Sequence, residues 1–341
     1  INLATGSLNG TGSILAGTGN VTLNASAGSI SLNQAVGQVA GNILNVRANS
    51  SSFLNTNVTT LVANITGAGQ NLTVNEMSSL LAVGQNITAN GGDISINLAT
   101  GSLNGTGSIL AGTGNVTLNA SAGSISLNQA VGQVAGNVLN VRANSSSFLN
   151  TNVTGLVANI TGANQSLTVN QAGRDLDIVT SNIRTNNGAL TLNVAAANNL
   201  TVTGNIDAAA ADVTLNAAGG FVNATGRITA GTLNVTANST STLNTAVNTL
   251  NANITGSGQT LNVTEADNLT IGAGNVRTNA ATITIDLATG SLTGTGNVIA
   301  GTGNVTLNAS AGGITLNTSA GQVSGNVLSV RANSSSFLNT N

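Results

Sequence analysis

Two aspartates set two residues apart are the acids in this chain best placed to do chemistry. Asp175 and Asp177 would lie on one face of a strand, beside Arg174. Clustered carboxylates of this kind could cleave a polysaccharide, because they hold and move protons. The same neighbourhood in an earlier copy, residues 79–82, reads Ser-Leu-Leu-Ala and has no acid. We therefore predict that the chain is not an enzyme.

Other acidic residues also change identity between copies of the repeat. Glu76 and Glu265 stand where another copy has Gln171, and Asp93 stands where another copy has Ala189. A catalytic acid could not be replaced in this way. We predict that these charges occupy solvated surface positions.

Metal binding has little support in the sequence. Calcium-binding β-rolls repeat Gly-Gly-x-Gly-x-Asp at every turn, and here only Gly91-Gly92-Asp93 approaches that pattern, once. Cys and His, the usual ligands of zinc and other transition metals, are missing. We predict neither a metal nor a cofactor.

Modification by sugars is the next chemistry to consider. Asn20, Asn49, Asn64 and Asn86 begin Asn-x-Ser/Thr sequences and are candidate glycosylation sites in a secreted chain. A chain this rich in Asn, Ser and Thr also produces such sequences by chance. An Asn that points into a core or a ladder could not be used.

Arginine and phenylalanine recur together. Three of the arginines are each followed six residues later by a Phe. Arg could pair with a carboxylate of a neighbouring coil or with a ligand sugar, whereas Phe could fill the core at a corner. The pairs are Arg47 with Phe53, Arg142 with Phe148 and Arg331 with Phe337.

The composition explains why so few residues invite chemistry. The 341 residues include no Lys, His, Cys, Pro, Trp or Tyr, and only 5% are charged. A net charge of -2 argues against nucleic acid, which requires a basic face. No apolar run approaches the roughly 18 residues of a membrane helix, so we predict no transmembrane segment in this window.

Hydrophobic residues make up 40% of the chain, which argues against disorder. They form short alternating runs, such as Val21-Thr22-Leu23 and Leu190-Thr191-Leu192. Alternation with a period of two places the apolar side chains on one face of a strand. The sequence therefore predicts an all-β protein.

A long internal repeat organises these strands. Residues 1–59 recur as 96–154 with one difference, Ile43 against Val138. The copies define super-repeats of 95 residues, about 1–95, 96–190, 191–284 and an incomplete 285–341. Dividing 95 by five predicts coils of about 19 residues, each with two or three strands and turns rich in Gly, Asn and Ser.

Stacked coils of this kind form a parallel β-solenoid with a continuous apolar core. We predict one continuous solenoid over residues 1–341, a fragment of a longer repeat array. Identical Asn side chains could form hydrogen-bonded ladders along it, although Asn could equally be a neutral turn residue. The candidates follow each Val-Thr-Leu: Asn24, Asn119, Asn216 and Asn308.

The coils of about 19 residues, the Gly-Asn-Val-Thr-Leu-Asn-Ala phrases and the lack of Lys, Cys and Pro resemble the repeat shaft of filamentous-haemagglutinin-type exoproteins. This resemblance implies a right-handed parallel β-helix. It also implies a large adhesin exported by two-partner secretion. An extracellular or bacterial cell-surface location would follow, with a role in adhesion, aggregation or biofilm formation.

Three functions remain open at this stage. The first is a structural shaft that holds a binding tip away from the cell or contacts host or cell-surface glycans along its length. The second is a self-assembling extracellular filament or sheath, whose partners are neighbouring repeats or identical chains. The third is a Thr-rich face for ice or crystalline polysaccharide, for which the Thr rows are too sparse and interrupted.

Overall fold

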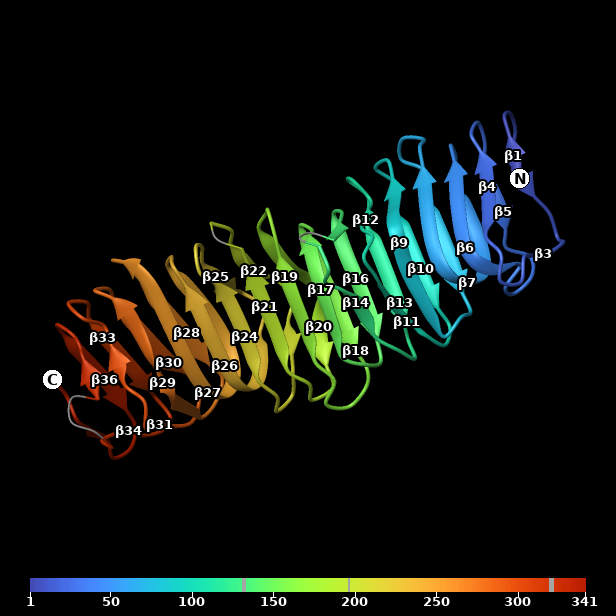
Figure 1. The fold of residues 1–341 in the computed structure, drawn as a ribbon. Helices are drawn as coiled ribbons and strands as arrows, with labels where there is room; N and C mark the ends of the chain where they lie inside the picture. Colours follow the sequence, from blue (N-terminus) through green and yellow to red (C-terminus); the bar gives the residue numbers. More distant parts are fainter. Residues whose placement is uncertain (131–132, 196, 319–321) are drawn as a thin grey trace. The chain divides into compact units, whose positions relative to one another are not determined.

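A computed structural model describes residues 1–130, 133–195, 197–318 and 322–341. Every regular element in these ranges is a β-strand, and every recorded strand pairing is parallel. The chain divides into two compact units, Ile1–Gly173 and Arg174–Asn341. Each unit is a stack of coils in which strands of successive coils lie side by side (Figure 1). The predicted all-β parallel solenoid is confirmed.

The strands of the first unit are β1 (Asn2–Leu3), β2 (Leu8–Asn9), β3 (Ile14–Leu15), β4 (Val21–Ala25), β5 (Ile30–Leu32), β6 (Val39–Ala48), β7 (Ser52–Ile65), β8 (Leu72–Glu76), β9 (Leu80–Ala89), β10 (Ile94–Leu98), β11 (Ser102–Gly105), β12 (Ile109–Leu110), β13 (Val116–Ala120), β14 (Ile125–Leu127), β15 (Val134–Ala135), β16 (Val138–Ala143), β17 (Ser147–Asn152), β18 (Gly155–Ile160) and β19 (Leu167–Gln171).

The strands of the second unit are β20 (Leu176–Thr185), β21 (Leu190–Val194), β22 (Leu200–Val202), β23 (Ile206–Asp207), β24 (Val213–Ala217), β25 (Val222–Ala224), β26 (Ile228–Ala237), β27 (Ser241–Ser257), β28 (Leu261–Glu265), β29 (Leu269–Asn279), β30 (Ile283–Leu287), β31 (Leu292–Gly294), β32 (Val298–Ile299), β33 (Val305–Ala309), β34 (Ile314–Leu316), β35 (Val323–Ser324), β36 (Leu328–Ala332) and β37 (Phe337–Leu338).

Coils are about 22 residues apart, which roughly matches the predicted size. The spacing is uneven: Asn97 lies 22 residues from its hydrogen-bonded partner in the coil before, Asn75 lies 20 from its own, and Asn251 lies 17 from its own. Short coils arise where two strands merge into one long strand such as β7, so that turn residues are lost. The predicted 19 residues lie within the range of these spacings but below the usual 22, so 95 residues hold fewer than the five coils predicted.

The core follows from the period-two alternation. In β13 the side chains of Val116, Leu118 and Ala120 are fully buried, whereas the Thr and Asn between them point outward. Strands one coil away keep this alternation in register, for example Leu118 opposite Ile96 and Val141. Each inward position therefore extends a column of apolar side chains along the unit.

Glycine is required where the turns of successive coils nearly touch. A Cβ atom on Gly123 would lie 2.3 Å from the carbonyl oxygen of Gly101, and one on Gly312 would lie 2.1 Å from that of Gly290. Real Cβ atoms do not approach backbone this closely. The Ser-Ala-Gly and Ala-Gly-Gly turns are thus fixed by contact between coils.

The super-repeat does not contain a whole number of coils. Phe53 lies in a column with Ser31 and Thr73, on β5, β7 and β8. Phe148, its copy 95 residues later, lies in a different column, between Ser126 of β14 and Thr168 of β19. Because 95 residues span a little over four coils, each super-repeat presents the same sequence on another sheet of the solenoid.

The second unit has the same offset. Val213 and Val305 begin copies of the Val-Thr-Leu-Asn-Ala phrase. Val213 lies between Leu190 and Leu233, whereas Val305 lies between Ile283 and Leu328. The single continuous solenoid over 1–341 stays a prediction, because the two units are described separately.

Candidate binding face and buried corners

A row of asparagines runs along one sheet of the first unit. Asn33 follows β5, and the other members lie on β7, β8, β10 and β13, one to a coil. A second row of outward residues runs beside it. Its members pair in register from coil to coil and are Ser31, Phe53, Thr73, Ser95 and Thr117. We call this surface the amide face and define it by Asn33, Asn55, Asn75, Asn97 and Asn119.

Side-chain hydrogen bonds link the amide face into a ladder. The Nδ2 of Asn55 donates to the backbone oxygen of Asn33 at 2.9 Å. The Nδ2 of Asn75 donates to Oδ1 of Asn55 at 3.0 Å, and the Nδ2 of Asn97 donates to Oδ1 of Asn75 at 3.1 Å. These bonds hold the amides of Asn55, Asn75 and Asn97 in one orientation, half-buried, at the spacing of the coils, about 4.8 Å. Asn119 comes next in the column, outside the ladder.

A cleft of about 350 Å³ opens over this ladder. The amides of Asn55, Asn75, Asn97 and Asn119 line it together with apolar groups at its rim. At that rim Val36 is 73% exposed and Met77 is 42% exposed. The cleft thus combines fixed amide groups with an apolar edge.

The ladder was predicted at other positions. At Asn24, Asn119, Asn216 and Asn308 the Oδ1 atom is buried and has no hydrogen-bond partner, so the ladder prediction is wrong there. Asn24 and Asn119 lie opposite Arg47 and Arg142 of the next coil, where no amide continues the row. Asparagines in consecutive coils are not sufficient for a ladder, because Asn119 also lies opposite Asn97 of the coil before.

Phenylalanine lies on the surface, and its predicted place in the core is wrong. Phe53 and Phe148 are each 37% exposed and Phe337 is 59% exposed. The period of two decides this outcome, because Phe53 lies between the buried neighbours Ser52 and Leu54. Phe53 therefore stands next to Asn55 on the outer side of β7.

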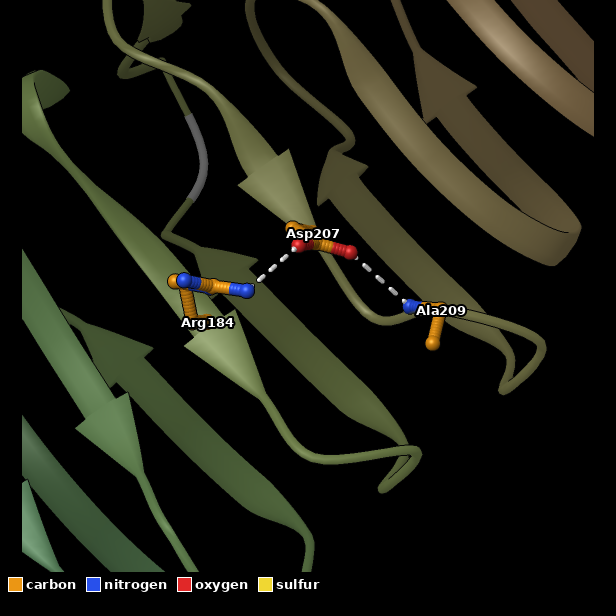
Figure 2. A network of polar contacts seen from close by, with 3 residues as sticks. All are labelled: Arg184, Asp207 and Ala209. Atoms are coloured by element: carbon orange, nitrogen blue, oxygen red, sulfur yellow. Dashed lines mark hydrogen bonds and ion pairs between the residues drawn. The ribbon is translucent and has the colours of Figure 1, made fainter.

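The recurring arginines are also exposed, and among the described residues no carboxylate lies within ion-pair distance of Arg47, Arg142 or Arg331. An ion pair does form in the second unit, where Arg184 lies 3.3 Å from Asp207 (Figure 2). Asp207 also accepts a hydrogen bond from the backbone N–H of Ala209. Both charged side chains are well exposed, so this pair contributes little stability.

Glu76 and Glu265 overturn the surface prediction made for them, because they are 1% and 0% exposed. Each ends a strand and points inward at the corner that follows. The Oε2 of Glu76 accepts the hydroxyl of Thr56 at 2.7 Å, and its Oε1 accepts the backbone N–H groups of Val58, Met77 and Ser78. The carboxylate satisfies donors that the turn would otherwise leave unpaired.

The same corner in the next super-repeat uses Gln171, which is 2% exposed. Its Oε1 accepts from Thr151 Oγ1 and from the backbone N–H of Val153, and its Nε2 donates to the backbone oxygen of Val153 at 2.6 Å. Sequence reasoning treated the exchange of Glu for Gln as a sign of a surface position. A buried corner also permits this exchange, because Glu and Gln side chains have the same shape and both accept the hydrogen bonds of the corner.

A second kind of corner holds Gln38, Gln133 and Gln322, which are all fully buried. Gln38 accepts the backbone N–H of Gln34 and donates to the carbonyl oxygens of Gly10 and Gly12 in the coil before. Buried side-chain amides thus tie loops to neighbouring coils. The sequence carried no signal for them beyond their recurrence.

Burial raises the pKa of the Glu265 carboxyl above its ordinary value of 4.5. Hydrogen bonds from Thr245, Val247 and the following backbone N–H groups oppose that rise. Desolvation is the larger effect, so the pKa is raised and this carboxyl takes up a proton more readily in the folded protein than an exposed carboxyl does.

The remaining acids support turns. Asp93 is exposed, as predicted, and its Oδ1 accepts the backbone N–H of Asn115. Asp175 accepts two hydrogen bonds from Asn199, and Asp177 accepts the hydroxyl of Thr203. The two aspartates therefore bridge successive coils.

The four candidate glycosylation sites have exposed side chains. Oδ1 of Asn20 and of Asn86 accepts a backbone N–H from a neighbouring coil, and Oδ1 of Asn49 and of Asn64 accepts a threonine hydroxyl. Glycosylation at these residues stays a prediction.

In the described part of the chain, no three His, Cys, Asp or Glu side chains gather closely enough to hold a metal ion. The described residues also include no helix long and apolar enough to span a membrane. Comparisons of the chain with protein-family models, curated proteins and solved structures gave no match.

Proposed function

We propose that this chain is a structural shaft of a large secreted bacterial surface adhesin that mediates adhesion and biofilm formation. One observation carries the proposal: each unit consists of parallel coils whose inward apolar columns and backbone pairing continue from coil to coil, with local register shifts such as the one between Leu61 and Ala63. Such a stack extends in one direction and resists bending. Those are the properties of a spacer.

The chemistry of the side chains agrees with a mechanical role. Buried polar groups such as Glu76 and Gln171 bond to backbone groups of their own corners, and exposed acids such as Asp175 bridge coils. The proposal therefore includes no catalytic activity and no cofactor. Its localisation is extracellular, at the bacterial cell surface, and its partners are glycans or other cells.

A self-assembling extracellular filament is the second candidate, favoured by the low charge of the chain. With nine acids against seven arginines, repulsion between copies is weak. In that function the partners are identical chains.

Immunogold electron microscopy of the producing cells, with an antibody against this chain, tests the proposal. A shaft predicts thin single rods attached to the cell at one end, and loss of cell adhesion when the coding segment is deleted in frame. Regular fibres with several chains in cross-section would favour the filament instead. Label confined to the cytoplasm would refute both.

A further inference from the structure

We infer that the amide face binds an extended, uncharged polysaccharide whose chain lies along the solenoid axis, and that the super-repeat displays a second such face on another sheet. The inference rests on the proposed function and deepens it, because it names the class of glycan that the shaft contacts. It is carried by the cleft, the ladder and the offset of the repeat.

The polar groups of the face suit hydroxyl groups. An Asn amide offers two N–H donors and two acceptor lone pairs. In the ladder, Asn75 uses its Nδ2 toward Asn55 and its Oδ1 toward Asn97. Asn75, and likewise Asn55, keeps one donor and one lone pair for a ligand. A sugar hydroxyl can both accept and donate.

The geometry suits a polymer. The ladder fixes successive amides at the coil spacing of about 4.8 Å, and it runs perpendicular to the strands through β7, β8 and β10. A hexose residue in an extended polysaccharide has a similar length. The exposed Val36, Met77 and Phe53 can pack on the apolar faces of sugar rings.

The electrostatics favour a neutral chain. From Ser31 to Asn119 the two rows of the face carry no charged residue, and the first cation in the amide column is Arg142 in the following coil. Glu76 also lines the cleft, but its carboxylate is 1% exposed and is bonded to backbone N–H groups of its own corner. An anionic polymer would gain little from such a surface. A peptide strand is also a poor occupant, because the backbone groups of these strands are already paired on both sides within the sheet.

The second face repeats the sequence of the first and lies on another sheet of the solenoid. Phe148, Asn150 and Asn170 repeat Phe53, Asn55 and Asn75, and the Nδ2 of Asn170 donates to Oδ1 of Asn150 at 3.0 Å. Its column includes Ser126 of β14, which the turn at residues 121–124 separates from β13 of the amide face. One chain can therefore hold two polysaccharide strands in different directions.

The third and fourth super-repeats supply substitutions that the fold tolerates. Thr242, Thr264 and Asp286 occupy there the positions of Phe53, Asn75 and Asn97, outward on β27, β28 and β30. A variant carrying Phe53→Thr, Asn75→Thr and Asn97→Asp removes the first face, and Phe148→Thr with Asn170→Thr removes the second. The matched control is Thr284→Ser, a change at an outward strand position of the second unit that belongs to neither face.

Affinity electrophoresis through gels containing dextran, mannan, galactan or laminarin tests the inference, with alginate and hyaluronan as anionic probes. We expect at least one neutral polymer to retard the chain, removal of the first face to weaken retardation about twofold, and removal of both to weaken it at least tenfold. Thermal unfolding at unchanged temperature shows that each variant is folded. We also expect the chain, but neither one-face variant, to cross-link the polymer and increase its light scattering.

Retardation that survives loss of both faces would overturn the inference, as would retardation by the anionic polymers alone or by none of the six. These results come from purified chain and leave the cell-surface proposal to the immunogold experiment. Loss of adhesion on cells combined with no retardation in gels would retain the shaft and discard this binding face.

Discussion

The corner that ends β8 and the corner that ends β19 have the same geometry but different charge. Glu76 and Gln171 lie 95 residues apart in equivalent positions, both buried and both bonded to a threonine hydroxyl of the coil before. The amide of Gln171 also donates to the backbone oxygen of Val153, which an ionised carboxylate cannot do. The corner thus requires an inward acceptor of the right length, and charge is tolerated there.

Removing the acceptor should have the largest effect on this comparison. We expect Glu76→Leu to lower the free energy of unfolding by about 3 kcal/mol, because Thr56, Val58 and Ser78 lose a buried partner. Urea denaturation measures the change. Met77→Leu, at an exposed neighbour, should change stability by less than about 0.5 kcal/mol. A loss below about 1 kcal/mol for Glu76→Leu would mean that water replaces the carboxylate.

Adding a charge to the neutral corner should have the next largest effect. We expect Gln171→Glu to lower stability at pH 7 by about 2 kcal/mol, because the new carboxylate is buried and the hydrogen bond to the oxygen of Val153 is lost. Gln129→Glu adds the same charge at an exposed position and should be nearly neutral. If Gln171→Glu is as stable as the parent chain, the corner at Gln171 accepts a carboxylate as readily as the corner at Glu76.

These corners also mark what the sequence could and could not predict. The alternation in Val116–Ala120 and the 95-residue repeat were sufficient for an all-β parallel solenoid, because inward and outward positions are decided locally by a period of two. The same alternation, applied to residues 52–54, predicts that the side chain of Phe53 points outward. The prediction of Phe in the core failed because residue type, a large aromatic, was given more weight than its place between buried neighbours.

The partners of the polar side chains depend on register, which the repeat length alone does not fix. The ladder from Asn55 through Asn75 to Asn97 joins coils of 20 and 22 residues, a register that the 95-residue repeat does not give. Asn119, one further coil of 22 residues along, has an unpaired Oδ1. The burial of Glu76 depends on the corner that Thr56 and Val58 build one coil earlier. Contacts between coils therefore appear only once each coil length is known.

The corner that holds Glu265 tests the same comparison through the pH dependence of stability. Burial raises its pKa in the folded state above the unfolded value of 4.5, so its contribution to stability is fully present below that value and is lost as pH rises through the folded pKa. We expect Glu265→Gln to match the parent near pH 4 and to be more stable at pH 7, by roughly 1–2 kcal/mol with the added hydrogen bond.

Urea denaturation of the Glu265→Gln variant and of the parent from pH 4 to pH 8 measures this difference, and subtraction removes the effect of acids common to both. Asp267 and Asp286 lie nearby and remain in both proteins. A difference that stays constant with pH would contradict the raised pKa. A variant less stable than the parent at pH 7 would mean that the charge itself holds the corner.

The smallest expected effect is a difference of about 1 kcal/mol between the two hydroxyl donors. Thr56 donates to a carboxylate at 2.7 Å and Thr151 donates to an amide oxygen at 2.8 Å. Bonds to ionised acceptors are roughly twice as strong as neutral ones. We expect Thr56→Val to cost about 2 kcal/mol and Thr151→Val about 1 kcal/mol at pH 7. In the Glu76→Gln background, the losses of stability caused by Thr56→Val and Thr151→Val should become equal. If the losses still differ there, packing around Thr56, and not the charge of Glu76, causes the difference.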